Sequence, residues 1–178
     1  MENKTMFILC GEAFSGKSTL AKQLSQHYGV KIVGIDEVYF ATESILALEN
    51  TPDEDDTSLW KNLWTVVFQV IKNHLLLGNS VVVDDNCFRL SRRDELRSLA
   101  ETMRTRTVLI YIDIPMEVLK ERKDKNKISK ERHDVPSAWM LEDAQKFERP
   151  NESENPIIYS PEMTFEDLLK TISDRNKH

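Results

Sequence analysis

Short apolar runs alternate along the chain with longer stretches in which apolar residues recur at helical spacing. The short runs predict strands that are buried on both faces of a sheet, and the longer stretches predict helices that cover it. The predicted strands are 5–10, 31–35, 81–83, 107–112 and 157–159. The predicted helices are 18–28, 59–77, 92–103, 115–122, 137–147 and 165–172. This alternation is typical of βαβ units around a parallel sheet, so it predicts the α/β class.

The bulk composition narrows the class of protein. The 178 residues suit one domain, 1–178, and no linker divides them. No apolar stretch approaches the roughly 20 residues of a membrane span, and the amino terminus lacks a signal-peptide pattern. Cys10 and Cys87 have neither disulfide nor metal-ligand spacing, which favours a reducing cytoplasm, with Cys10 as a buried core thiol.

The charge balance bears on partners. The formal net charge is −6 and the pI is about 5.3, which argues against broad, non-specific binding of nucleic acid. A nucleic-acid acceptor stays open but is not favoured, and no membrane partner is expected. The amphipathic helices fit a monomer or a homodimer equally well.

The strongest motif reads Gly11-Glu12-Ala13-Phe14-Ser15-Gly16-Lys17-Ser18, which matches the Walker A spacing G-x-x-x-x-G-K-[ST]. Glycines let successive backbone N–H groups curl around a phosphate, and the following helix directs its positive end to the same point. Lys17 can reach the β- and γ-phosphates, and the Ser18 hydroxyl can bind Mg²⁺. An apolar strand precedes the motif and an amphipathic helix follows it. Residues 11–18, with Thr19, are therefore predicted to bind ATP.

Acidic residues follow two of the predicted strands. Asp36 follows the second strand and is predicted to accept the proton of an acceptor hydroxyl; the alternative is an N-cap of a helix over 37–48. Asp84 and Asp85 follow the third strand, and a hydrophobic strand ending in Asp is the Walker B pattern that holds Mg²⁺. Asp84 is preferred for the metal because it directly follows Val83, and Asp85 for contact with the substrate. A turn capped by Asp is the alternative.

Two segments differ from the rest of the chain by their charge. The acidic segment 49–56 is either a solvated loop that favours the start of the next helix or a flap that attracts a cationic substrate. The basic segment 120–132 is either an exposed helical face or part of a lid, about 120–135, that contacts phosphate.

Arginines are the predicted partners of the transferring phosphoryl group. Arg122 and Arg132, in the basic segment, are predicted to stabilise its charge, because guanidinium groups bind phosphate oxygens in a fork. Arg89, Arg92 and Arg93 follow the third strand and are expected at the surface or at a helix start. Arg89 is the candidate among them for a substrate contact.

Taken together, these residues resemble the P-loop kinase group that includes polynucleotide kinase, zeta toxin and chloramphenicol phosphotransferase. The likeness runs from Phe7 to about Phe147 and rests on the Walker A motif, Asp36, the strand over 81–83 with Asp84 to Asn86 and the arginines after it, and Arg122. It implies a three-layer P-loop NTPase fold with a five-stranded parallel sheet and a helical lid. It also implies use of ATP and Mg²⁺ to phosphorylate a hydroxyl, with Asp36 as the general base. Lysines stand one turn after Arg122, so Arg132 takes the part of a second lid arginine.

Three functions remain open. The first is a kinase that acts on the hydroxyl of a small molecule. The second is a polynucleotide or nucleotide-sugar kinase, although the carboxylates at 53–56 suit a polyanionic acceptor poorly. The third is an ATPase or nucleotide switch acting on a protein partner; against it, the chain has no Asn-Lys-x-Asp sequence and no extra helical domain.

Overall fold

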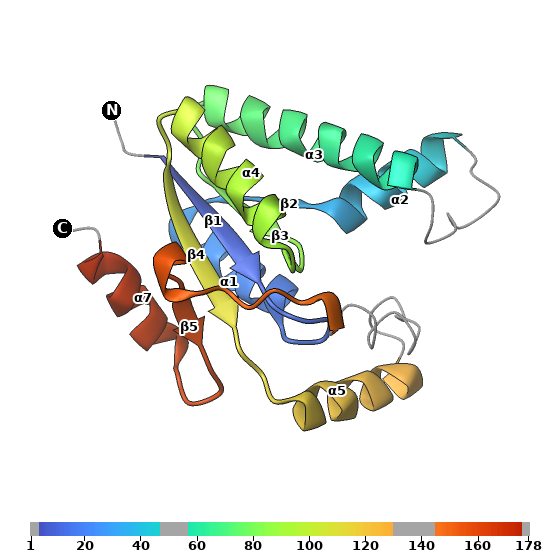
Figure 1. Ribbon diagram of the computed structural model, residues 1–178, viewed down its shortest axis with the longest axis vertical. Helices are drawn as coiled ribbons and strands as arrows, with labels where there is room; N and C mark the ends of the chain where they lie inside the picture. The colour runs from blue at the N-terminus through green and yellow to red at the C-terminus, as the bar shows by residue number, and fades with distance from the viewer. Residues whose placement is uncertain (1–3, 47–56, 130–144, 176–178) are drawn as a thin grey trace.

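A five-stranded parallel sheet forms the centre of the computed structural model, which describes residues 4–46, 57–129 and 145–175 (Figure 1). The strands are β1 (Thr5–Cys10), β2 (Lys31–Gly34), β3 (Val81–Asp84), β4 (Arg106–Ile112) and β5 (Ile157–Tyr159). Their order across the sheet is β2-β3-β1-β4-β5, and the register sets Ile8 of β1 beside Val83 and Leu109. The expected parallel sheet is confirmed, and each predicted strand lies within one residue of its predicted bounds.

Six helices and one 3₁₀ turn connect these strands in the described ranges. They are α1 (Lys17–Tyr28), α2 (Ile35–Leu46), α3 (Thr57–Leu76), α4 (Leu90–Thr102), α5 (Met116–Ser129), η1 (Glu152–Glu154) and α7 (Phe165–Asp174). The prediction that the helix ends at Arg122 is wrong: α5 continues to Ser129, because residues 123–129 are mostly Lys, Asp and Asn, which lack apolar periodicity but include neither Gly nor Pro. The helix predicted over 137–147 lies mainly outside the described residues.

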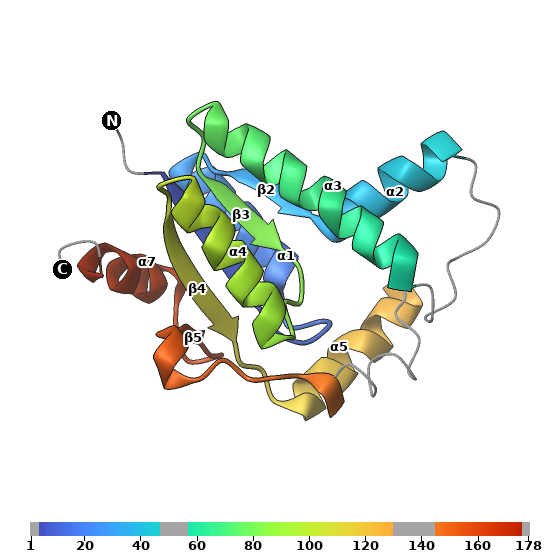
Figure 2. The same cartoon turned by 45° about the horizontal axis from the view of Figure 1, so that its top comes forward.

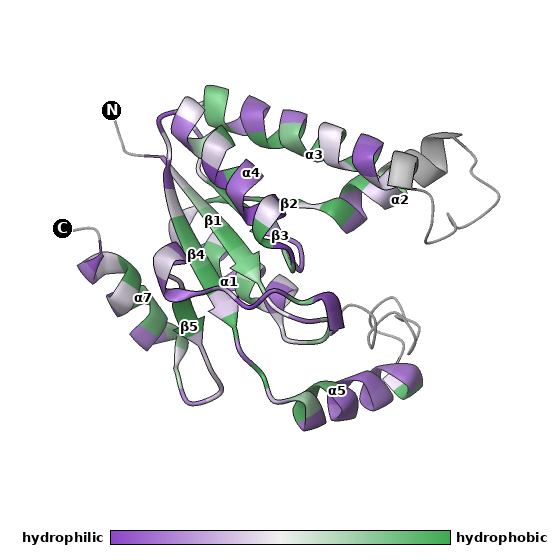
Figure 3. Cartoon of the chain, in the orientation of Figure 1, coloured by the Kyte–Doolittle hydropathy of each residue, from purple (hydrophilic) through white to green (hydrophobic). Residues whose placement is uncertain are grey.

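The helices cover the sheet on both faces, which gives three layers (Figure 2). On one face, α3 and α4 pack residues such as Val67, Ile71 and Leu96 against β1 and β3. On the other face, α1 and α7 pack Leu24 and Leu168 against the sheet. Strands covered in this way are apolar on both sides, and Figure 3 shows them as the most hydrophobic part of the fold.

Helix α5 differs from the helices of these layers. Figure 3 shows it as mostly hydrophilic, and it lies beyond the carboxyl end of β4 in place of covering a face of the sheet. Its residues Leu119, Lys123 and Asn126 are nevertheless buried. The basic segment is therefore not a uniformly exposed helical face.

A buried ion pair fixes α4 to the segment before β5. The Arg93 side chain is fully buried, and its Nε and Nη2 donate to Glu154 Oε2 and Oε1 at 2.7 and 2.9 Å. Arg93 Nη1 also donates to Cys87 O at 2.8 Å, and Arg97 donates to Glu154 at 2.9 Å. Burial alone would raise the pKa of Glu154, but hydrogen bonds from Arg93, Arg97 and the Asn151 N–H hold this pKa at about 2.

Removing this carboxylate should destabilise the fold strongly. In Glu154→Gln the buried Arg93 loses its counterion, so the free energy of unfolding at pH 7 should fall by roughly 3–5 kcal/mol. Because the pKa of Glu154 is lowered by folding, its contribution is complete above the unfolded value of about 4.3 and is lost as pH falls through about 2.

Urea unfolding at several pH values checks this prediction. The difference between wild type and Glu154→Gln should be constant above about pH 5 and shrink towards pH 2. Glu152→Gln, a change at an exposed position of η1, is the matched control and should leave stability nearly unchanged. A loss of stability that does not depend on pH would contradict the role given to the Glu154 charge.

Candidate nucleotide and acceptor site

The Walker A residues form a tight loop between β1 and α1. Gly16 has φ 108°, a left-handed conformation that favours glycine, and Phe14 also has a positive φ of 64°. A Cβ added to Gly11 would lie 2.9 Å from Ile112 O, so only glycine allows this approach to β4. The Ser15 Oγ is buried and has no hydrogen-bond partner in the described part of the chain. The loop thus has the shape and an unsatisfied polar atom that suit a bound phosphate.

Lys17 is anchored on the carbonyl groups of the same loop. Its Nζ donates to Gly11 O at 2.9 Å and to Glu12 O at 2.8 Å. Burial lowers the pKa of Lys17, while the charges of Asp85 and Asp84 raise it. The first residues of α1 place Ser18 and Thr19 next to it, with both side chains exposed.

The predicted lid arginine lies against the loop. Arg122, in α5, donates from Nη1 to Phe14 O at 3.1 Å and to Ser15 O at 2.8 Å. These bonds join residues more than 100 positions apart in the sequence and bring a guanidinium to the edge of the phosphate loop. The second predicted lid arginine, Arg132, and the acidic residues at 53–56 lie outside the described residues.

The three acidic residues predicted at strand ends lie in one neighbourhood. Gly34 of β2 is in register with Asp84 of β3, and Asp36 stands two residues further along, in the first turn of α2. Burial raises the pKa of Asp85, the Cys87 N–H and Lys17 lower it, and the charge of Asp36 raises it. The charges of Asp85 and Asp84 act on Lys17, and the charge of Asp36 acts on Asp85, so the three carboxylates and the ammonium form one electrostatically coupled group.

The two adjacent aspartates differ in their hydrogen bonding. Asp85 Oδ2 accepts a hydrogen bond from the Cys87 N–H at 2.9 Å, which is the turn-capping role considered as its alternative. Asp84 ends β3 and is only partly buried. The alternative for Asp36, an N-cap before a helix that begins at residue 37, does not match the structure. The helix α2 begins at Ile35, so Asp36 is inside its first turn and does not precede it.

Oxygen donors for Mg²⁺ are available at this site. The Ser18 hydroxyl is exposed, and the Asp84 carboxylate is coupled electrostatically to the adjoining Lys17. Within the described ranges no group of three or more His, Cys, Asp or Glu side chains could hold a metal. The donor set fits Mg²⁺, which commonly uses one or two protein oxygens together with substrate phosphates and water.

Replacing Asp84, the predicted metal carboxylate, should raise the magnesium requirement. In Asp84→Asn we expect the Mg²⁺ concentration for half-maximal ATP turnover to rise about tenfold or more, because a neutral amide binds the cation more weakly. Asp85→Asn is the matched comparison, and its shift should be smaller because Asp85 bonds the Cys87 N–H. Magnesium titrations of ATP turnover at constant ionic strength measure both, and a larger shift in Asp85→Asn would reverse the assignment.

Arg89 and Arg92 lie at the start of α4, as expected: Arg89 is the residue before the helix and Arg92 is in its first turn. Arg89 is exposed with its guanidinium 5.2 Å from the Phe88 ring centre. Arg92 lies 3.9 Å from the Trp64 ring centre, pairs with Glu95 at 2.6 Å, and lowers the pKa of Asp85, so it is the arginine coupled to the acidic residues.

Two residues near this region were not anticipated. Arg93 lies in the first turn of α4, as one expectation had it, but the expectation of a surface residue is wrong because its side chain is buried; its spacing with Leu96 and Ala100 on α4 carried that signal. Glu148, in the described stretch that precedes η1, accepts the Leu90 N–H at 2.6 Å and donates its own N–H to Phe88 O at 2.8 Å. It therefore satisfies the first N–H of α4 from a distant segment, which local sequence does not reveal.

The thiols are not part of a reactive site. Cys10 and Cys87 are both buried and free, and burial raises the pKa of Cys10 to about 12. Burial likewise raises the pKa of Cys87 well above its ordinary value. The expectation that Cys10 is a core thiol is confirmed.

Sequence and structure comparisons identify relatives of this chain. A family model described as an AAA domain matches residues 6–150. The chain belongs to this AAA domain family. An L-seryl-tRNA(Sec) kinase of Methanococcus maripaludis is 31% identical in an alignment of 155 residues, which covers 78% of this chain and 57% of that protein. The chain therefore spans little more than half the length of this relative.

Solved structures share the fold at low sequence identity. A candidate kinase of Chloroflexus aurantiacus superposes with a TM-score of 0.75 at 16% identity, covering 97% of this chain and 98% of that one. Kti12 of Chaetomium thermophilum, in complex with ADP-AlF3, gives a TM-score of 0.74 at 13% identity, covering 97% of each chain. With the family match, these findings confirm the expected resemblance to P-loop kinases and the three-layer α/β fold. None of the described helices has the length and apolar character needed to span a membrane.

Proposed function

We propose that the protein is an ATP-dependent phosphotransferase that moves the γ-phosphate to the hydroxyl of a small molecule. The observation that carries the proposal is the convergence of Lys17, Arg122 and the carboxylates at the ends of β2 and β3 on one phosphate loop. A nucleotide-binding loop alone would be equally compatible with a nucleotide-dependent switch protein. A carboxylate at the end of β2, beside cations over the phosphate, is what transfer to a hydroxyl needs.

Each side chain has a distinct part in the proposed reaction. Asp36 accepts the proton of the acceptor hydroxyl as its oxygen bonds to the γ-phosphorus, and the bond from that phosphorus to the β,γ-bridging oxygen breaks to release ADP. Lys17 and Arg122 stabilise the negative charge on the transferring group, and the loop N–H groups hold the phosphates. Mg²⁺, which Ser18 and Asp84 would hold, neutralises phosphate charge when bound.

A second acceptor class has specific support. The relative of 31% identity is named for a seryl-tRNA, so a hydroxyl carried on a nucleic acid is the alternative to a small molecule. The net charge of −6 favours the small molecule, because a tRNA acceptor is bound largely through phosphate contacts. An ATPase or nucleotide switch acting on a protein partner is the third candidate.

Phosphate transfer to a panel of acceptors tests the proposal. Wild-type protein with ATP and Mg²⁺ is incubated with sugar acids, aminoglycosides, chloramphenicol, nucleosides, nucleotide sugars, 5′-hydroxyl oligonucleotides and seryl-tRNA. Phosphorus-31 NMR then distinguishes a new phosphate ester from inorganic phosphate. A small-molecule ester would support the proposal, and an ester on RNA would move the assignment to the second class. Steady release of inorganic phosphate with every acceptor would favour the ATPase or switch.

A further inference from the structure

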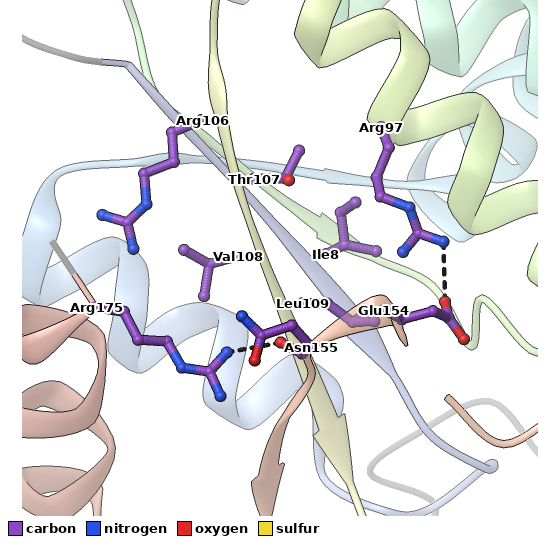
Figure 4. Close-up of a pocket in the computed structure, with 9 residues that line it drawn as sticks. All are labelled: Ile8, Arg97, Arg106, Thr107, Val108, Leu109, Glu154, Asn155 and Arg175. Atoms are coloured by element: carbon purple, nitrogen blue, oxygen red, sulfur yellow. Dashed lines mark hydrogen bonds and ion pairs between the residues drawn. The ribbon is translucent and has the colours of Figure 1, made fainter. Parts of the chain in front are cut away.

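A cavity of about 230 Å³ lies at the amino-terminal end of β4, away from the phosphate loop (Figure 4). Its floor is the strand segment 106–109, and its walls come from α4, from the segment around η1 and from the residue after α7. Arg106 is in register with Thr5 at the start of β1, whereas the phosphate loop follows the other end of that strand. At about 3.3 Å per residue, roughly 15–20 Å separate Arg106 from the loop, and about 10 Å separate the loop from Ile8, which lines the other end of the cavity.

The cavity exists because β5 does not run along the whole of β4. β5 pairs only with Ile110, Tyr111 and Ile112. The Arg106 N–H donates to Lys4 O beside β1, whereas the Asp113 N–H donates to Tyr159 O at the end of β5. Since successive residues of a strand alternate in direction, the backbone groups of Thr107 face the β5 side, which β5 leaves open. A backbone N–H donor therefore borders the cavity.

Positive charge exceeds negative charge in the lining. Arg97, Arg106 and Arg175 line the cavity, and Glu154 is the one carboxylate among the described lining residues. Both oxygens of Glu154 are already engaged, by Arg93 and Arg97. The Arg97 Nη1 is buried and has no hydrogen-bond partner in the part of the chain that the structure describes. Arg97 is itself paired, through Nη2, with Asp94 at 2.7 Å and with Glu154 at 2.9 Å, so its free donor is Nη1. The excess positive charge of the lining comes from Arg106 and Arg175.

The other two lining arginines, Arg106 and Arg175, repel each other and form no ion pair with a carboxylate in the part of the chain that the structure describes. Arg175 donates to Asn155 O at 2.6 Å and to Pro156 O at 3.1 Å, which fixes its guanidinium without neutralising it. Burial lowers the pKa of Arg175, and the nearby charge of Arg106 lowers it further. Arg106 has no carboxylate partner among the described residues. Figure 4 shows this pair on one side of β4 and Arg97 on the other.

We propose that this cavity is a binding site for a small polyvalent anion, a phosphate ester or a polycarboxylate. Guanidinium groups match the oxygens of both anions in a planar fork, and an anion between like charges offsets their repulsion. The volume is below the roughly 300 Å³ at which pockets for drug-sized ligands begin, so the ligand is small. None of these arginines belongs to the proposed phosphotransfer site.

NMR titration of the full chain tests this site directly. Inorganic pyrophosphate and citrate serve as probes in separate titrations at matched ionic strength, and amide shifts are followed residue by residue. The amides of Thr107 and Asn155 report on the cavity, while those of Gly16 and Ser18 report on the phosphate loop, which we also expect to bind pyrophosphate. We expect saturable shifts of the cavity amides. The probe that binds with the higher affinity indicates whether the cavity prefers phosphate or carboxylate.

Two substitutions that each remove one arginine charge distinguish specific binding in the cavity from general electrostatic attraction to the protein. Arg106→Gln should weaken binding at the cavity by about tenfold or more, as expected from losing a charge-assisted contact. Arg104→Gln, at an exposed position two residues earlier and outside the cavity, should weaken it less than twofold, an estimate for a screened surface charge. Shifts at the phosphate loop should be the same in both variants. Equal weakening by both substitutions, or no saturable shift at the cavity with either probe, would overturn the proposal.

Discussion

Lys17→Ala is expected to lower the kcat for ATP turnover by roughly 10³-fold, the scale of removing one preorganised contact to the transition-state charge. Lys17 is anchored by two loop carbonyls, so its ammonium is already positioned at the phosphate loop before ATP binds. Preorganisation matters because no reorganisation is then required as the γ-phosphoryl group transfers. The measurement is steady-state ADP production at saturating ATP and Mg²⁺.

The same substitution should change the pH dependence of the remaining activity. The Lys17 charge lowers the pKa of Asp85, so its removal should let burial raise this pKa further. Protonation of Asp85 should then begin at a higher pH, and the acidic limb of the pH–rate profile should shift to higher pH. Lys31→Ala, at an exposed lysine at the start of β2, is the control and should alter neither quantity.

A thermal-shift assay tests whether the Lys17→Ala variant is folded. Wild type and Lys17→Ala should melt at similar temperatures without ligand, while the stabilisation by ATP should be much smaller in the variant. A variant that keeps most of its kcat would show that the phosphate loop of this chain does not use Lys17 in catalysis. The AAA domain family would still describe the fold, but the proposed phosphotransfer would need other residues.

The strands and the phosphate loop could be predicted from the sequence because their signals are local. A run such as Val81 to Val83 is apolar at successive positions only when both faces of a strand are covered. The Walker A spacing likewise reflects one continuous turn of backbone that needs Gly16 at a positive φ. Features of this kind depend on neighbouring residues and are visible in one sequence.

The features that were missed depend on contacts between distant segments. Arg93 is buried because Glu154, 61 positions away, supplies its counterion. Arg92 stacks on Trp64 of α3, and its charge lowers the pKa of Asp85, so its distinction from Arg89 needs the packing of two helices. The length of α5 was underestimated because charged helix formers carry no apolar period. Long-range ion pairs have no local signature, so their residues look like ordinary surface charges.

Asp36→Asn should abolish transfer to the acceptor while leaving ATP binding and basal hydrolysis intact. Loss of a general base costs about 10²–10⁴-fold, and the amide keeps the size of the side chain. Asp36 is exposed in the first turn of α2, beside the end of β3, and its charge reaches both Asp85 and Glu37. The measurement is acceptor-dependent ester formation beside acceptor-free phosphate release, for the same preparation.

Glu37→Gln is the matched control for this prediction, because Glu37 is the next residue and is also exposed. Burial and the charges of Asp84 and Asp36 raise the pKa of Glu37, so it is a second candidate base at the same helix start. If Asp36→Asn removes transfer and Glu37→Gln preserves it, Asp36 is the base. The reverse result would assign the base to Glu37. Transfer that survives both changes would leave Asp36 as a first-turn carboxylate that stabilises α2 by about 0.3–1 kcal/mol, and the acceptor hydroxyl would then be activated without either side chain.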